Sequence, residues 1–289
     1  MANVNVYEMV TNRIINELKN GIIPWRKPWY STKGAVSHVT GKSYSMLNQF
    51  LLGCSGEWLT FAQVKKEGGN VKTGEKSRFV VFWKFLEKKT GDLDSDGNEI
   101  IDRIPFLKYI NVFEVSQCEG IERKFNKVKE TNTEPVDEAQ KVFDSYVTRE
   151  GITVNNDGEQ AFYRPSTDSI TLPSIKRFEK VAEYYSTAFH EAIHSTGSAK
   201  RLNREGVVSL TFFGSHDYSK EELIAELGAS MTLNRLGMET VESFTNSTAY
   251  IQNWLKKLES DPKFIVNASG KAEKAVKFLF GEKIEEEVA

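Results

Sequence analysis

The segment with the clearest chemical content is YYSTAFHEAIHSTG, residues 184–197. It places His190 and His194 four residues apart, with Glu191 directly after the first histidine. On an α-helix, side chains four residues apart share a face about 5–6 Å from each other, so both imidazoles can bind one metal ion. The glutamate can then hold a water molecule beside that ion and accept its proton during attack on a carbonyl. The spacing predicts a catalytic Zn²⁺ site, although another divalent metal also suits these ligands.

The competing interpretation is that the two histidines lie on this helix only for packing. The chain has 4 histidines in all. Two of them at this spacing, with a glutamate between, would arise by chance in fewer than about one case in a hundred. The residues around the motif are mostly apolar, which predicts a buried helix over about 174–196 that ends at Gly197. The metal site is therefore the favoured interpretation.

A zinc site of this kind needs a third protein ligand, and SKEELIAELGAS, residues 219–230, offers two candidates. Glu222 and Glu226 are four residues apart, so one could bind the metal while the other orients a ligating histidine. Glu222 also has a structural interpretation, because Ser219-x-x-Glu222 matches a helix capping box. Spacing alone leaves this choice open.

The charge is distributed unevenly along the chain. Residues 1–90 carry 14 Lys+Arg against 6 Asp+Glu, whereas the whole chain has a net charge of −2. Basic and aromatic residues alternate in this part, as expected for a surface that holds phosphates and stacks bases. The candidates are Trp25, Arg26, Lys27, Trp29, Lys42, Tyr44, Lys72, Lys76, Arg78 and Lys84. They predict binding of single-stranded DNA without sequence specificity, although any one aromatic residue could instead belong to the core.

Periodicity predicts the elements that position these residues. Residues 5–20 have the pattern of an amphipathic helix, and a short helix is expected after Thr60. SRFVVFWKFLEKK and PFLKYINVFEVSQ are typical of strands joined by a polar loop. Beyond a polar stretch at 119–135, AFYRPSTDSITLP is expected to be extended. The remaining sequence predicts helices near 135–151, 174–196, 219–237, 247–260 and 268–282.

This order of elements predicts an α+β protein of two domains. Residues 1–122 would form an α+β single-stranded-DNA-binding domain and 123–135 a linker. Residues 136–289 would form a mainly helical domain with a small sheet, which carries the histidine pair. The chain has 2 cysteines, too few for a disulfide scaffold, and no apolar run approaches the ~18 residues of a membrane span. We expect a cytoplasmic protein with no membrane partner.

Short segments in both halves resemble the ArdC-type antirestriction proteins of plasmids, integrative elements and phages. IPWRKPW, TGKSYSMLN, WLTFAQVKKEGGNVKTGEKS, FWKF and YINVFEVSQ resemble the N-terminal single-stranded-DNA-binding domain of that family. The same domain occurs in plasmid primases of the TraC type. AFYRPSTDSITLP, YYSTAFHEAIHSTG, RLNRE, EELIAELGAS, AYIQNWL and DPKFI resemble its zincin-like metallopeptidase domain.

The resemblance implies Glu222 as the third metal ligand, with Glu226 behind it, and a strand at DSITLP near the edge of the cleft. It also implies a zinc metallopeptidase, with Glu191 as general base, that single-stranded DNA brings to host restriction or other DNA-associated proteins. The alternative is a protein that shields entering DNA and whose metal site is structural or catalytically silent. The presence of Glu191 favours the first hypothesis, because a structural site needs no general base.

Overall fold

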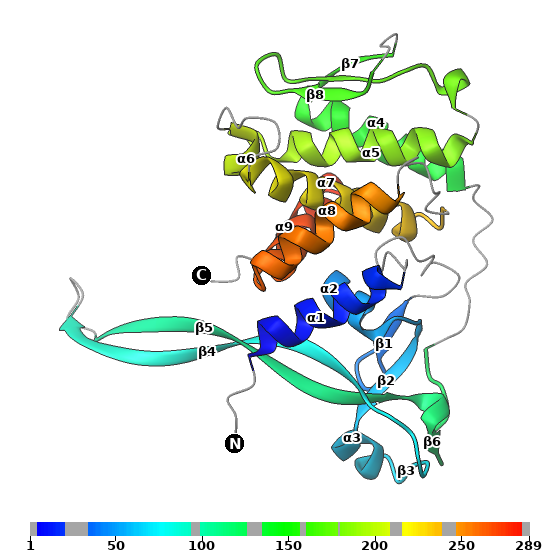
Figure 1. The fold of residues 1–289 in the computed structure, drawn as a ribbon, viewed down its shortest axis with the longest axis vertical. Helices are drawn as coiled ribbons and strands as arrows, with labels where there is room; N and C mark the ends of the chain where they lie inside the picture. The colour runs from blue at the N-terminus through cyan, green and yellow to red at the C-terminus, as the bar shows by residue number, and fades with distance from the viewer. Residues whose placement is uncertain are drawn as a thin grey trace.

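The computed structural model describes residues 5–20, 34–93, 99–125, 135–156, 160–178, 180–208, 216–238 and 247–284. Figure 1 shows a part built around a long β-ribbon below and a mainly helical part above. The predicted α+β class with two domains is confirmed. The domain limits of 1–122 and 136–289 stay predictions.

The N-terminal half combines three short helices with a mixed sheet. Its elements are α1 (Val6–Lys19), β1 (Ala35–Ser37), α2 (Met46–Leu52), β2 (Gly56–Thr60), α3 (Phe61–Lys66), β3 (Asn70–Val71), β4 (Arg78–Leu93), β5 (Glu99–Glu114) and β6 (Cys118–Glu119). The main sheet has the order β1-β2-β5-β4, in which only β1 and β2 are parallel. Thr60 caps α3 as predicted, in a reciprocal capping box with Gln63.

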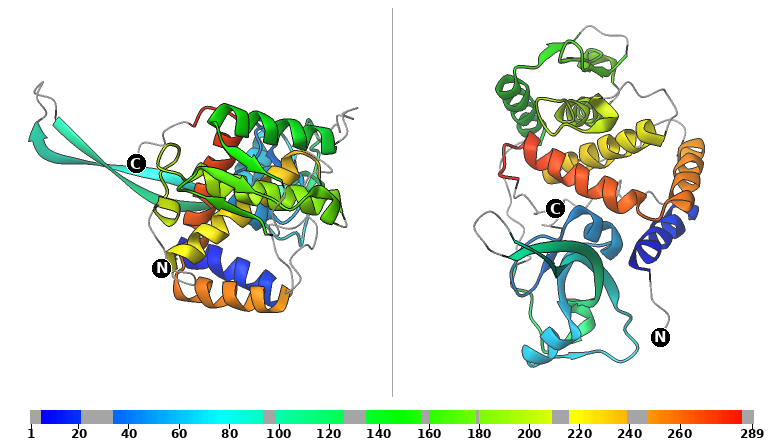
Figure 2. Two further views of the ribbon diagram at one scale, coloured as in Figure 1. Left: turned by 90° about the horizontal axis from the view of Figure 1, so that it is seen from above. Right: turned by 90° about the vertical axis from the view of Figure 1, so that its left-hand side faces the viewer.

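Strands β4 and β5 form an antiparallel ribbon that is much longer than the rest of the sheet. It projects from the body of the molecule in Figure 1 and also in the view from above in Figure 2. At its root, the buried side chain of Asn48 in α2 fixes the position of β4. Its amide nitrogen donates to the carbonyl of Val81 at 2.8 Å and its oxygen accepts from the Val81 amide at 2.7 Å. These two bonds anchor the base of the ribbon on α2.

The C-terminal half is mainly helical. Its elements are α4 (Pro135–Glu150), β7 (Thr153–Asn155), β8 (Phe162–Arg164), β9 (Ser169–Thr171), α5 (Val181–Thr196), α6 (Glu205–Val208), α7 (His216–Arg235), α8 (Ser247–Ser260) and α9 (Phe264–Leu279). The small sheet has the order β7-β9-β8. The prediction that α5 begins near residue 174 was wrong, because 175–177 form a separate 3₁₀ turn and Phe178 is extended. The ring of Phe178 packs edge-on against Tyr184 at 5.6 Å, a contact inside the fold that sequence periodicity does not contain.

Helix α1 packs against the C-terminal helices although it belongs to the first half of the chain. Val10 and Ile14 are fully buried in the same apolar cluster as Trp254 and Phe264. The Thr11 hydroxyl donates to the backbone carbonyl of Pro262 at 2.7 Å. The two halves therefore share one hydrophobic core.

Neither cysteine forms a disulfide: the thiol of Cys118 is buried and that of Cys54 half-buried. Within the described ranges, no helix has both the length and the apolar character that a membrane crossing requires.

A buried arginine joins three elements near the histidine helix. Arg201 makes two 2.9 Å bonds to the carboxylate of Asp168 and one of 3.0 Å to Glu150, and only 1% of its side chain is exposed. It also donates to the backbone carbonyl of Ser195 at 3.1 Å. Arg201 thus connects the ends of α4 and α5 to the turn between β8 and β9.

Replacing Arg201 with alanine is expected to lower the free energy of unfolding by about 3 kcal/mol, because Asp168 and Glu150 would keep partly buried charges without their partner. Lys200→Ala is the matched control. Its side chain is 76% exposed and lies 3.6 Å from Asp168, so its loss should change stability by less than about 0.5 kcal/mol. Urea denaturation measures both values, and equal losses for the two variants would contradict the structural role of Arg201.

Candidate functional site

Helix α5 presents the two histidines side by side at the end of a buried segment. Between Ala188 and Thr196, His190 and His194 are partly exposed, with 14% of each side chain accessible, whereas the other residues are buried. Their Nε2 atoms are 3.1 Å apart and their ring centroids 4.7 Å apart. Two nitrogens with metal-binding lone pairs therefore face the same point.

Helix α7 brings a carboxylate to this point. The carboxylate oxygens of Glu222 lie 3.6 Å from His190 Nε2 and 3.4 Å from His194 Nε2. The two helices approach closely at Gly228, where a Cβ atom would lie 2.8 Å from the side chain of Ile193. Among the described residues, His190, His194 and Glu222 form the one group whose ligand atoms lie within 4.8 Å of one another and could hold a metal ion.

Glu226, the alternative third ligand, lies one turn further along α7, is buried, and is outside this group. The capping-box interpretation of Glu222 was wrong. Helix α7 begins at His216, so Ser219 lies inside the helix and cannot cap its start. Glu222 is therefore available to the histidines, and its role as a ligand stays a prediction.

The second nitrogen of His194 contacts a residue that the sequence did not single out. Its Nδ1 lies 3.3 Å from Glu221, whose carboxylate accepts bonds of 2.6 and 3.0 Å from Arg204. Arg204 is itself anchored by 2.7 Å bonds to the Thr196 hydroxyl and to the carbonyl of Ile193. This chain of contacts fixes the orientation of the His194 ring, as is usual for ligating histidines.

The charges of this cluster stabilise one another. Burial alone would lower the pKa of His194, but its contacts with Glu221 and Glu222 raise it to about 10. Burial would raise the pKa of each glutamate, yet the histidines, together with Arg204 at Glu221, hold both pKa values below the usual range. Near neutral pH both carboxylates are therefore ionised, and the metal-free His194 ring carries a proton that it must release to bind a metal cation.

Glu191 is buried, with 8% of the residue exposed, and is held from the side of the small sheet. Its carboxylate accepts a 2.8 Å hydrogen bond from the backbone amide of Tyr163 in β8. The DSITLP segment was expected to be a strand near the edge of the cleft, and its residues Ser169–Thr171 do form a strand. This strand, β9, pairs with both β7 and β8 and so has no free edge to which a peptide could add, whereas β8 is the strand that bonds to Glu191.

The predicted DNA contacts lie in several places. Trp25, Arg26, Lys27 and Trp29 are outside the described residues. Exposed side chains belong to Lys42, Lys72, Lys76, Arg78 and Lys84. Tyr44 is half-buried against the small cluster around Trp58, and burial raises its pKa, so it has the surroundings of a packing residue.

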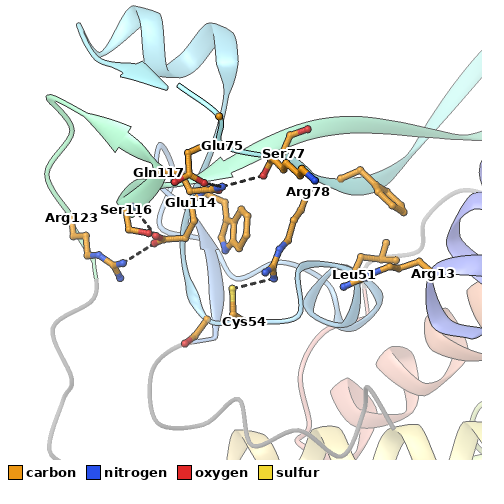
Figure 3. Close-up of a pocket in the computed structure, with 15 residues that line it drawn as sticks. Arg13, Leu51, Cys54, Glu75, Ser77, Arg78, Glu114, Ser116, Gln117 and Arg123 are labelled. Carbon is orange, nitrogen blue, oxygen red and sulfur yellow. Dashed lines mark hydrogen bonds and ion pairs between the residues drawn. The ribbon is translucent and has the colours of Figure 1, made fainter. Parts of the chain in front are cut away.

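Two of these cations line an open hollow of about 980 Å³ at the root of the ribbon (Figure 3). Four basic side chains surround it, Arg13, Lys76, Arg78 and Arg123, against two acids, Glu75 and Glu114. Arg123 forms a 2.9 Å ion pair with Glu114, and Arg78 donates to the carbonyl of Leu52. The hollow has an excess of positive charge, which favours anionic ligands.

Comparisons with known proteins match both halves of the chain. A family model described as the N-terminal domain of anti-restriction factor ArdC matches residues 4–113. A second, described as a zincin-like metallopeptidase, matches residues 141–271. Among solved structures, the antirestriction ArdC protein from plasmid R388 is 33% identical, and the alignment covers 96% of this chain and 97% of that one. Its metal-free form gives a TM-score of 0.73 and its Mn(II)-bound form 0.74.

Curated relatives extend the comparison. Two DNA primase TraC proteins of Escherichia coli are 34% and 33% identical over 93% and 94% of this chain. The chain spans only 19% and 27% of the length of these two proteins. The protein y4eC of Sinorhizobium fredii is 30% identical over 95% of this chain and 91% of its own length.

Proposed function

Because the chain belongs to the ArdC family of antirestriction proteins, we propose that it binds single-stranded DNA and carries a zinc-dependent peptidase site. The observation that supports the peptidase most strongly is the meeting of His190, His194 and Glu222, with the buried Glu191 next to His190 on the same helix. The R388 relative with bound Mn(II) supports a divalent metal in this family.

The donor set fits one divalent ion. Metal–ligand distances of about 2.0–2.2 Å are compatible with ligand atoms 3.1–3.6 Å apart, as these are. Two imidazoles and one carboxylate also leave a coordination position for water or substrate, which is typical of catalytic zinc sites. A zinc ion there would polarise a carbonyl and lower the pKa of a bound water toward ~7.

The protein's own residues would supply positioning and proton transfer. Glu191, fixed by the amide of Tyr163, takes a proton from the attacking water and returns it to the departing amine. Glu221 keeps the His194 ring in the orientation that directs Nε2 toward Glu222. Substrates would be host restriction or other DNA-associated proteins that meet the bound DNA strand.

One observation favours the alternative function, a DNA-shielding protein whose metal site is silent. The ion pairs of Glu222 with both histidines can hold α5 and α7 together without catalysis. A structural site, however, gains nothing from the buried Glu191, so the peptidase is the better-supported proposal. Variants of Glu191 distinguish the two functions, since the peptidase needs this carboxylate and the silent site does not.

For the DNA-binding part, the exposed cations of the first half predict affinity that depends strongly on salt. With about five phosphate contacts, raising salt from about 50 to 200 mM should weaken binding to a labelled oligo(dT) strand about 100-fold. Fluorescence anisotropy measures this, and a duplex of equal length is the comparison. A salt-independent affinity, or none at low salt, would overturn the DNA-binding proposal.

A further inference from the structure

The register of the β-ribbon places four residues in a regular pattern on one face. Phe82 pairs with Lys108 across the strands, and Lys84 pairs with Phe106. Residues two apart on a strand share a face, so all four side chains lie on the same side of the ribbon. The phenylalanines occupy one diagonal of this square and the lysines the other. We call Phe82, Lys84, Phe106 and Lys108 the ribbon platform.

The ribbon platform is accessible. Phe82 is 41% exposed, both lysines are exposed and Phe106 is partly exposed. The amino group of Lys108 lies 5.4 Å from the centre of the Phe106 ring, so a cation and an aromatic face already lie together. Large apolar side chains on an exposed ribbon are characteristic of an interaction surface rather than of a packed core.

The opposite face of the ribbon has a different role near its root. Val81 and Leu107 are buried in the main core. The ring of Trp83 packs edge-on against Tyr7 of α1 at 6.3 Å. This face is therefore used to hold the ribbon on the helical part, whereas the ribbon platform faces away from that contact.

Charge indicates what the ribbon platform binds. One face of β4 carries every second residue of the strand: Arg78, Val80, Phe82, Lys84 and Leu86. Their partners on the same face of β5 lie between Val112 and Ile104. These paired positions include three basic residues and no acidic one. Arg78, at the root of this face, also lines the positively charged hollow, and the buried Val80 and the exposed Ile110 lie between it and the ribbon platform. A partner with regular negative charge and flat apolar groups fits this surface.

We propose that the ribbon platform is the stacking site for single-stranded nucleic acid, with two neighbouring bases on Phe82 and Phe106 and phosphates on Lys84 and Lys108. Aromatic faces accept any base, so this contact would be independent of sequence. The strand would continue toward the hollow, where Lys76 and Arg78 meet further phosphates. This inference rests on the proposed DNA-binding function and assigns it to a particular surface.

The test uses the full chain and a labelled oligo(dT) strand. The double variant Phe82→Ala/Phe106→Ala should weaken binding by about 30-fold or more, since each lost stack reduces affinity at least about fivefold. The matched control is Phe85→Ala, which lies on the same strand with 39% exposure but on the opposite face, and should bind like wild type. Circular dichroism confirms that each variant is folded.

A second pair of substitutions separates stacking from charge. Lys84→Gln/Lys108→Gln should reduce the salt dependence of binding, lowering the slope of log affinity against log salt by about 0.7 for each lysine. The phenylalanine variant should leave this slope unchanged. If Phe82→Ala/Phe106→Ala and Phe85→Ala weakened DNA binding equally, the cause would be a general loss of apolar surface on the ribbon. That result would overturn the proposal.

Two further outcomes would show that the ribbon platform is not the stacking site. If wild type binds with strong salt dependence and Phe82→Ala/Phe106→Ala binds equally well, the DNA function stands and its stacking site lies elsewhere. If wild type sediments as a dimer and this variant as a monomer with unchanged DNA affinity, the surface joins two copies of the chain. Failure of wild type to bind at low salt would instead reject the DNA function itself.

Discussion

Glu191→Gln is expected to lower the rate of peptide-bond hydrolysis about 10²–10⁴-fold, the usual contribution of a general base. Glutamine keeps the size of the side chain and an oxygen that can accept the hydrogen bond from the Tyr163 amide. It cannot take a proton from the attacking water. Metal content should therefore match wild type while hydrolysis of a fluorogenic peptide library is nearly lost.

The control for this substitution lies on the same helix. Glu183→Gln removes a carboxylate two turns before Glu191, in the first turn of α5, and should leave hydrolysis unchanged. The same variants decide between the two proposed functions when unmodified DNA is transferred as a single strand into a restricting host. Full protection by Glu191→Gln would show that proteolysis is not the mechanism and would favour shielding of the DNA.

The second large effect is expected on metal affinity. Replacing Glu222 with alanine should weaken binding of Zn²⁺ or Mn²⁺ about 10²–10³-fold. This corresponds to one ligand's share of the roughly 10–16 kcal/mol with which four protein ligands bind zinc. Glu221→Gln should weaken binding about 10–100-fold, since it disturbs the orientation of His194 without removing a ligand. Competition with a coloured chelator measures all the affinities.

Glu226→Ala completes this series and should bind metal like wild type, because Glu226 lies outside the converging group. The opposite ranking, with Glu226→Ala the weaker binder, would identify Glu226 as the third ligand. Melting temperature gives an independent reading. An ion that binds the folded state raises it in proportion to the logarithm of its concentration, and this rise should be smallest in Glu222→Ala.

The candidate site could be predicted from the sequence as far as one helix determines it. The four-residue spacing of His190 and His194 fixes their common face within α5, and the structure places their nitrogens 3.1 Å apart. Glu221 and Arg204 were missed because their contacts join α5 to the start of α6 and to α7. No periodicity within a single segment carries information about such contacts.

The same limit applies to the fold: the sequence predicted the elements with a local signal and missed those that depend on distant segments. The strands around SRFVVFWKF and PFLKYINVF were predicted because alternation and aromatic content are local properties. Strands β1, β2 and β7 were not predicted, since each has at most 5 residues and depends on pairing with distant segments. Likewise, β9 is a central strand only because β7, formed by residues before it, adds to its other side.

The packing of α1 against Pro262 and the C-terminal helices has a mechanical consequence. Neither half can open fully without exposing apolar surface on the other, so the chain is expected to melt in one cooperative transition rather than two. A cut in the backbone between the halves would leave the fragments associated through this packing. The half proposed to hold DNA and the half with the histidine cluster would then stay attached to each other for as long as either is folded.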